Sequence, residues 1–154
     1  MRKEFVRSSK GMAEVEQEEL PITCLLDTDI VIDYLRGHQY AKTLLDHFTR
    51  FTGGLAAISV ITHLEVYMGM RPQEEAATQA FLDGLVSIEV DITVARRAGK
   101  LLKQLRSRGI TVGLADGIIA ATAEALGVPL LTNNVDHYPL PQLQVIRGID
   151  YELD

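Results

Sequence analysis

Short apolar runs alternate with longer segments of helical period from Ile22 onward, which is typical of an α/β domain with a largely parallel sheet. The apolar runs predict strands, and the segments in which apolar residues recur every three or four positions predict helices. The predicted strands cover residues 22–27, 55–59, 86–89, 129–132 and 143–147. The predicted helices cover residues 28–36, 40–51, 61–70, 73–84, 92–108 and 114–126. We therefore expect an α/β fold whose central sheet has four or five mainly parallel strands.

Residues 1–20 lack this alternation. The first ten residues contain four basic side chains and one acidic one. Four glutamates follow before position 20: Glu14, Glu16, Glu18 and Glu19. A segment with many charges and few apolar residues does not bury enough surface to fold by itself. We expect a flexible leader over residues 1–20, within which Met12 could be the natural start, and a single domain over residues 21–154.

Composition indicates a globular protein with one domain. A chain of 154 residues suits one domain with a real core, and its 47% hydrophobic and 23% charged residues are values of a globular protein. No apolar run is long enough to cross a bilayer and no signal-peptide pattern opens the chain, so we expect a soluble, cytoplasmic protein without a membrane partner. The single cysteine, Cys24, excludes an intrachain disulfide and lies in an apolar run that predicts its burial.

Four acidic residues fall near the ends of predicted strands or the starts of predicted helices. Asp27 ends the first strand, Glu65 follows the second strand in the first turn of a helix, Asp116 begins a helix, and Asp136 follows the fourth strand. Ligands of open parallel sheets bind beyond the carboxyl ends of the strands, so we expect these acids to share one cleft. Clustered carboxylates repel one another unless a cation neutralises them, and Mg²⁺ and Mn²⁺ prefer oxygen ligands. The pattern therefore predicts a divalent metal site.

The same acids also have a structural interpretation. Asp27 could cap the helix that follows it, Asp116 could cap a helix over residues 117–126, and the segment from Thr62 to Glu65 has the spacing of a capping box. Any one of these acids alone is more often a cap than a metal ligand. Their joint placement favours the metal site, and a helix N-terminus also favours the ionised carboxylate that such a site needs.

Other polar residues near the acids have weaker patterns. Asp29 and Asp33 lie four positions apart on one helix face, which predicts solvated surface. Thr28 and Thr132 end strands beside the acids and are candidates to hydrogen-bond the acids, a metal-bound water or the substrate. Asn133 and Asn134 offer neutral oxygen ligands or ordinary turn chemistry. His63 and His137 lie close in sequence to Glu65 and Asp136, which would suit a metal or acid–base role, but we expect them to be surface or packing residues.

A net charge of −6 gives no overall attraction to a polyanion, so binding one would need a local basic surface. The helix over residues 92–108 offers that surface, because its basic residues fall largely opposite the buried stripe: Arg96, Arg97, Lys100 and Lys103. Arg36 is a second candidate after the first helix. An ordinary solvated helix face is the alternative. With 6% aromatic residues and no tryptophan, contacts to a nucleic-acid backbone are favoured over base stacking.

Three segments resemble the PIN-domain ribonucleases, and among them the VapC-type toxins of toxin–antitoxin pairs: "LLDTDIVIDYLRG", "AISVITHLEVYMG" and "LADGIIAATAEALGVPLLTNN". The likeness runs from Ile22 to about Ile146. It assigns the first three catalytic and metal-binding acids of the family to Asp27, Glu65 and Asp116. Many members place the fourth acid where this chain has Asn134, and others slightly later, where Asp136 stands. The likeness therefore implies a supporting role for Asp136, with Asn134 as an alternative ligand.

Membership of this family would imply a three-layer α/β/α fold and hydrolysis of RNA phosphodiester bonds that depends on Mg²⁺ or Mn²⁺. It would also imply a cognate antitoxin protein as a partner and a homodimer. Three alternatives stay open. The opening "LLDTD" resembles haloacid-dehalogenase-like phosphatases, although Val31 stands where they need a threonine. A response-regulator receiver would need a late lysine, and none follows Lys103. A PIN fold that only binds RNA or protein is the third.

Overall fold

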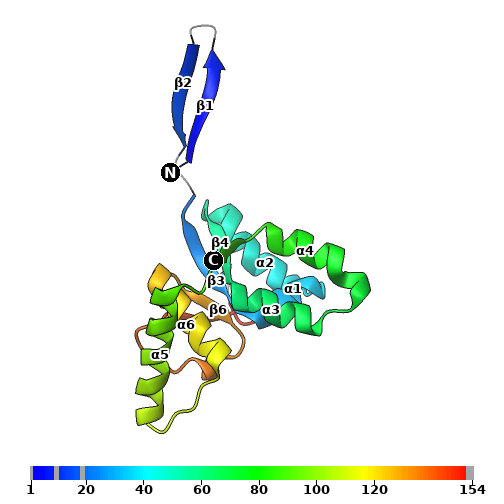
Figure 1. The fold of residues 1–154 in the computed structure, drawn as a ribbon. Helices are drawn as coiled ribbons and strands as arrows, with labels where there is room; N and C mark the ends of the chain where they lie inside the picture. The colour runs from blue at the N-terminus through cyan, green and yellow to red at the C-terminus, as the bar shows by residue number, and fades with distance from the viewer. Residues whose placement is uncertain (1, 9–10, 18–19, 152–154) are drawn as a thin grey trace.

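The computed structural model describes residues 2–8, 11–17 and 20–151, with side chains described from residue 20. Within these residues, one parallel sheet has five strands in the order β5-β4-β3-β6-β7 (Figure 1). The strands are β3 (Ile22–Leu26), β4 (Leu55–Ser59), β5 (Val86–Ile88), β6 (Leu130–Thr132) and β7 (Val145–Arg147). The chain adds β4 and β5 on one side of β3 and then crosses to β6 on the other side. This crossing makes the end of β3 a topological switch point, where such sheets bind ligands.

Helices cover both faces of this sheet. They are α1 (Thr28–Leu35), α2 (Gln39–Asp46), α3 (Val60–Gly69), α4 (Glu75–Asp83), α5 (Ile92–Ser107) and α6 (Leu114–Leu126). The central strand shows the two layers, because Leu25 packs into a core with α5 and α6, whereas Cys24 and Leu26 pack into a second core with α1 to α4. Figure 1 shows the same division, with α5 and α6 on one side of the sheet and α1 to α4 on the other. The predicted α/β/α architecture is therefore confirmed.

Two of the predicted helices differ from the observed ones at one end. The predicted helix over residues 40–51 is regular only to Asp46 and ends in a wider π-type turn, η1 (His47–Phe51). The predicted helix over residues 73–84 begins as a short 3₁₀ turn, η2 (Pro72–Glu74). A further 3₁₀ turn, η3 (Val135–His137), follows β6 in a segment without a predicted helix. In the part of the chain that is described, no helix is long and apolar enough to span a membrane.

An antiparallel pair of strands precedes the domain, β1 (Arg2–Ser8) and β2 (Gly11–Gln17). This pair occupies most of the segment for which the sequence predicts a flexible leader, and it projects away from the central sheet in Figure 1. Glu18 and Glu19 of the predicted leader lie outside the described residues. The division of the chain at residue 20 stays a prediction.

Candidate active site

Asp27 lies at the end of β3 and caps the N-terminus of α1. Its Oδ1 accepts a hydrogen bond of 2.8 Å from the backbone N–H of Thr28. Its Oδ2 accepts two more, at 2.8 Å from the hydroxyl of Thr132 and at 2.9 Å from the hydroxyl of Tyr138. Its backbone N–H is also paired, at 2.9 Å with the carbonyl of Leu131. Donors from α1, β6 and the segment after η3 therefore fix a carboxylate that is only 5% exposed.

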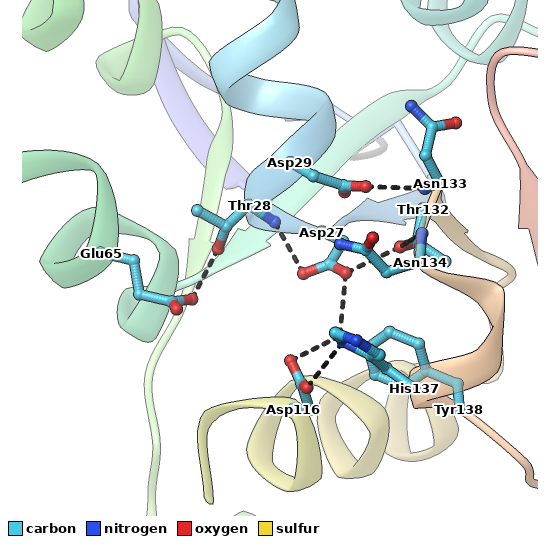
Figure 2. A network of polar contacts seen from close by, with 10 residues as sticks. All are labelled: Asp27, Thr28, Asp29, Glu65, Asp116, Thr132, Asn133, Asn134, His137 and Tyr138. Atoms are coloured by element: carbon cyan, nitrogen blue, oxygen red, sulfur yellow. Dashed lines mark hydrogen bonds and ion pairs between the residues drawn. The ribbon is translucent and has the colours of Figure 1, made fainter. Parts of the chain in front are cut away.

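Asp116 approaches Asp27 from the first turn of α6 (Figure 2). The helix begins at Leu114 with Gly113 as its cap, so the prediction that Asp116 caps this helix is wrong. Asp116 is instead the third helical residue, where the positive end of the helix dipole favours an ionised carboxylate. Its Oδ1 lies 3.2 Å from the hydroxyl of Tyr138, and its Oδ2 lies 3.2 Å from Nδ1 of His137. One tyrosine hydroxyl therefore contacts both Asp27 and Asp116.

Gly117 explains how α6 can start so close to α5. A Cβ at this position would come within 2.8 to 2.9 Å of the side chain of Leu102 on α5, too close for a real contact. The residue after Asp116 therefore has to be very small where the two helices meet. Close helix packing here places Asp116 beside the end of the sheet.

Glu65 points toward Asp27 from the opposite side, on α3. This helix begins at Val60 and is capped by Ser59, whose Oγ accepts a 3.1 Å hydrogen bond from the first turn. The capping-box interpretation of Thr62 and Glu65 is therefore wrong, and Glu65 lies in the second turn. The hydroxyl of Thr28 donates to Oε1 of Glu65 at 2.7 Å and lies 3.0 Å from the hydroxyl of Thr62. Glu65 is thus joined to the residue that follows Asp27.

Asp29 does not lie on solvated surface, which corrects the prediction from helix periodicity. It is half-buried, and its Oδ1 accepts a 2.9 Å hydrogen bond from the backbone of Ile30. Its Oδ2 accepts a 2.8 Å hydrogen bond from the backbone N–H of Asn133. Asp33 is also partly buried and accepts a hydrogen bond from the hydroxyl of Tyr40. Both acids of the first helix therefore belong to the polar network around the end of β6.

The side chain of Asn133 joins four segments of the chain. Its Nδ2 donates to the hydroxyl of Tyr40 on α2 at 2.7 Å, and its Oδ1 accepts from the backbone N–H of Ile149 at 2.9 Å. Together with the backbone bond to Asp29, these contacts connect the end of β6 to α1, to α2 and to the residues after β7. Asn133 therefore holds the loop that carries the candidate fourth acid.

Burial and like charge both act on the pKa values in this site. Burial raises the pKa of Asp27 and the charge of Asp116 adds to the rise, whereas its hydrogen bonds oppose it. Burial, followed by the charge of Asp27, raises the pKa of Asp29 to about 6. Burial and the two neighbouring carboxylates also raise the pKa of Tyr138. The tyrosine hydroxyl therefore keeps its proton and remains a donor to the acids.

The fourth predicted acid is placed differently from the others. Asp136 is exposed on η3, and among the described residues its side chain makes no hydrogen bond or ion pair with the other three acids. Asn134 is also exposed, and its backbone N–H donates to the hydroxyl of Thr132 at 3.0 Å. The next residue, His137, is exposed as expected, and its Nδ1 lies 3.2 Å from Oδ2 of Asp116. Tyr138 is a functional candidate that the sequence interpretation missed, and the contact with Asp116 makes His137 a second candidate.

The arrangement suits a hydrated divalent cation better than a closed cage of acids. Across residues 20–151, no three His, Cys, Asp or Glu side chains converge closely enough to hold one ion. Mg²⁺, however, is commonly bound by one or two carboxylates and keeps several of its waters. Asp27 and Asp116 offer two carboxylates that share one hydroxyl, so the ligand atoms that they present to a cation are oxygens. These two residues therefore fit such an ion, and the four-acid ligand set stays a prediction.

The basic residues of α5 border a groove of about 530 Å³. Its polar lining comprises Thr93, Arg96, Arg97, Lys100, Gln104, Glu124 and Gln142. Arg96 and Lys100 are exposed, whereas Nη1 of Arg97 forms an ion pair of 2.8 Å with Glu124. Glu124 lies eight residues after Asp116 on α6, about 12 Å further along the helix axis. The end of the groove at Arg97 and Glu124 therefore lies two helical turns away from Asp116.

The other predicted substrate contacts divide into two kinds. Thr28 and Thr132 are buried, and their hydroxyls donate to Glu65 and Asp27, as the acid-binding alternative expected. Arg36 and Lys103 are exposed, at the end of α1 and on α5. The threonines therefore hold the acids, and the basic residues are free to meet a ligand.

Comparison with known proteins matches the segments that carry the acids. The family model described as the PIN domain matches residues 24–142, which include the ends of β3 and β6 and the start of α6. The chain belongs to the PIN-domain family. The resemblance drawn from the three sequence segments is thereby confirmed, and the phosphatase and receiver alternatives are excluded. All four predicted acids of this PIN domain lie inside the matched range.

Relatives of this PIN domain include ribonucleases. It is 38% identical over 121 residues to Ribonuclease VapC19 of Mycobacterium tuberculosis, covering 78% of this chain and 96% of the relative. It is 31% identical to Ribonuclease VapC1 of Methanocaldococcus jannaschii over 126 residues, covering 81% of this chain and 84% of the relative.

Among solved structures, a toxin–antitoxin complex from Klebsiella pneumoniae matches with a TM-score of 0.69 and 30% identity, covering 85% of this chain and 100% of that chain. VapBC2 from Rickettsia felis bound to a promoter DNA fragment matches with a TM-score of 0.73 and 24% identity, covering 81% of this chain and 98% of that chain, and supports the fold alone.

Proposed function

We propose that this PIN domain is a metal-dependent endoribonuclease and the toxin of a toxin–antitoxin pair, acting in the cytoplasm. One observation carries the proposal: the end of β3 and the first turn of α6 bring Asp27 and Asp116 to the same hydroxyl group, at 2.9 and 3.2 Å. The relatives named as VapC ribonucleases support the reaction, and the toxin–antitoxin complex from Klebsiella pneumoniae supports the partner.

In this proposal Asp27 and Asp116 would hold Mg²⁺ or Mn²⁺ together with Glu65 of α3, and Asp136 or Asn134 would have a supporting role. A bound ion of this kind supplies an activated water nucleophile and neutralises charge on the leaving oxygen. The chain supplies the orientation. Donors to both oxygens of Asp27 fix that carboxylate, and the first turn of α6 holds Asp116 beside it.

We further propose that the RNA backbone lies along the groove on α5. Among the described residues, exposed Arg96 and Lys100 line this groove without an ion pair of the kind that Arg97 forms with Glu124, and exposed Lys103 lies further along α5. Because the Arg97 end of the groove is two turns of α6 away from Asp116, it would contact nucleotides some distance from the bond that is cut. Phosphate contacts of this type position a strand without reading its bases.

A second groove, with more apolar side chains, offers a surface for a protein partner. This groove, of about 400 Å³, lies among α1, α3 and α4, with Ile32, Leu35 and Val66 in its lining and with polar side chains that include Arg36, Arg71 and Glu74. We propose that the antitoxin binds here and that the toxin forms a homodimer. Replacing Ala77 in this groove by a glutamate should prevent co-purification with the cognate antitoxin and leave ribonuclease activity unchanged.

The main test is RNA cleavage by the purified protein with Mg²⁺ or Mn²⁺ and with a chelator. Asp27→Asn or Asp116→Asn should lower cleavage about 1,000-fold or more, because each removes a charge that holds the ion. Asp83→Asn, on the exposed end of α4, is the matched control and should cleave like the parent protein. Metal-dependent cleavage that both site variants retain would refute the site. Binding of RNA without cleavage would favour a non-catalytic PIN module.

A further inference from the structure

Tyr138 is a core residue whose hydroxyl contacts two carboxylates. It is 3% exposed, and its ring packs in the core with α5 and α6. Its backbone N–H is bonded to the carbonyl of Val135 at 3.0 Å, and its carbonyl accepts from Leu140 at 2.8 Å. The ring and the backbone therefore fix the position of the hydroxyl, which sits between two carboxylates (Figure 2). The hydroxyl has little freedom to follow those carboxylates if they move.

The hydrogen bonds of Asp27 leave one direction open. A carboxylate oxygen has two lone pairs, and the hydroxyls of Thr132 and Tyr138 occupy both of them on Oδ2. Among the described residues, Oδ1 accepts a hydrogen bond only from the N–H of Thr28, which leaves it one lone pair. Rotating the carboxylate would break two hydroxyl bonds at once. Oδ1 is therefore the oxygen that remains available to a cation.

The contact between the Tyr138 hydroxyl and Asp116 also indicates that this hydroxyl orders the acids. The hydroxyl has one proton and two acceptors, at 2.9 Å on Asp27 and 3.2 Å on Asp116, so it draws two like charges toward a common neutral group. A lysine in this place would neutralise the acids itself and compete with a cation, whereas a hydroxyl orders them and leaves their charge intact. The pair is therefore arranged before an ion arrives.

We propose that Tyr138 is a positioning residue of the metal site: its hydroxyl, together with that of Thr132, turns Asp27 so that Oδ1 faces the cation and keeps Asp116 beside it. This inference rests on the proposed function, because it presupposes that Asp27 and Asp116 hold the ion. It assigns to the loop after η3 a role that none of the four acids fulfils. A buried hydroxyl that merely satisfies two acids would leave metal affinity unchanged when removed.

The test is Tyr138→Phe, which keeps the buried ring and removes only the hydroxyl. Binding of Mn²⁺ alone to the metal-free protein, measured by calorimetry without RNA, should weaken about 10-fold to 100-fold, as for outer partners of metal ligands elsewhere. Thr132→Val removes the other donor to Oδ2 and should weaken binding in the same direction. Tyr151→Phe is the matched control, because its ring packs against the core with α1 to α4 and its hydroxyl contacts His47 and not an acid.

The outcomes separate this inference from the proposed function. If Asp27→Asn loses Mn²⁺ binding but Tyr138→Phe binds like the parent protein, the positioning role is refuted and the metal site stands. Tighter binding by Tyr138→Phe would also refute it, because the hydroxyl would then compete with the ion. If Asp27→Asn itself binds Mn²⁺ normally, the proposed metal site fails. Thermal unfolding of each variant in a chelator shows whether any loss is a folding defect.

Discussion

The acids at the end of the sheet and the bases on α5 are built in opposite ways. Asp27 is buried, and three donors from three segments fix its two oxygens. Arg96 and Lys100 are exposed beside an open groove. A buried carboxylate costs free energy unless donors satisfy it, whereas an exposed base costs almost none. The fold therefore fixes the carboxylate of Asp27, which needs a defined position. The basic side chains of the groove stay free to change conformation.

The largest difference between the two regions should appear when one glutamate is replaced in each. Glu65→Gln should lower kcat about 100-fold or more, because Glu65 faces the acid site and contacts Thr28. Glu124→Gln on α6, next to the basic groove, should leave kcat within about twofold, since its partner is Arg97 and not an acid of the site. Steady-state cleavage of one RNA by both variants checks this, and equal losses would contradict the distinction.

A smaller effect of another kind is expected in the basic groove. Replacing Arg96 and Lys100 together by alanine should raise KM about tenfold at low salt with little change in kcat, because backbone contacts supply affinity and not chemistry. The dependence of log K on log salt should become shallower by about 1.4 if each base meets one phosphate of a single strand. Lys42→Ala with Arg50→Ala, exposed on α2 and η1, is the matched control. An unchanged salt slope would show that RNA binds to another surface.

The smallest expected effect is a pH dependence of stability confined to the acid side. The pKa of Asp29 rises from 3.8 to about 6 on folding, so the folded protein binds a proton more tightly than the unfolded chain. The contribution of Asp29 to stability should be full below about pH 4 and be lost as pH rises through about 6, and the raised pKa of Asp27 adds to the same trend. Thermal unfolding in a chelator should show this slope, and Asp29→Asn should flatten it whereas Asp83→Asn should not.

Local patterns in the sequence were sufficient to predict the sheet and helix order. Apolar runs identified every strand of the central sheet, and the end of the first run located Asp27 at the switch point. The three quoted segments also led to the correct family. These features depend on residues close together in the chain, which is why the sequence alone could predict them.

Contacts between distant segments were not predictable in this way. Helix periodicity placed Asp29 on a solvated face, but the backbone of Asn133, more than a hundred residues later, covers it. The choice among Asp136, His137 and Tyr138 depended on one 3₁₀ turn, which decides which of three consecutive side chains points at Asp116. No residue pattern at that position indicates the direction of such a turn.

The hydrogen bonds of Asn133 determine how the loop after β6 can open. Because its backbone and side chain join α1, α2 and the segment at Ile149, the loop after β6 cannot open without releasing all three. Neighbouring elements linked in this way exchange with solvent as one cooperative unit rather than fraying one by one. The acids at the end of β3 and the residues that follow β7 should therefore share a single opening free energy, although they lie at opposite ends of the domain's sequence.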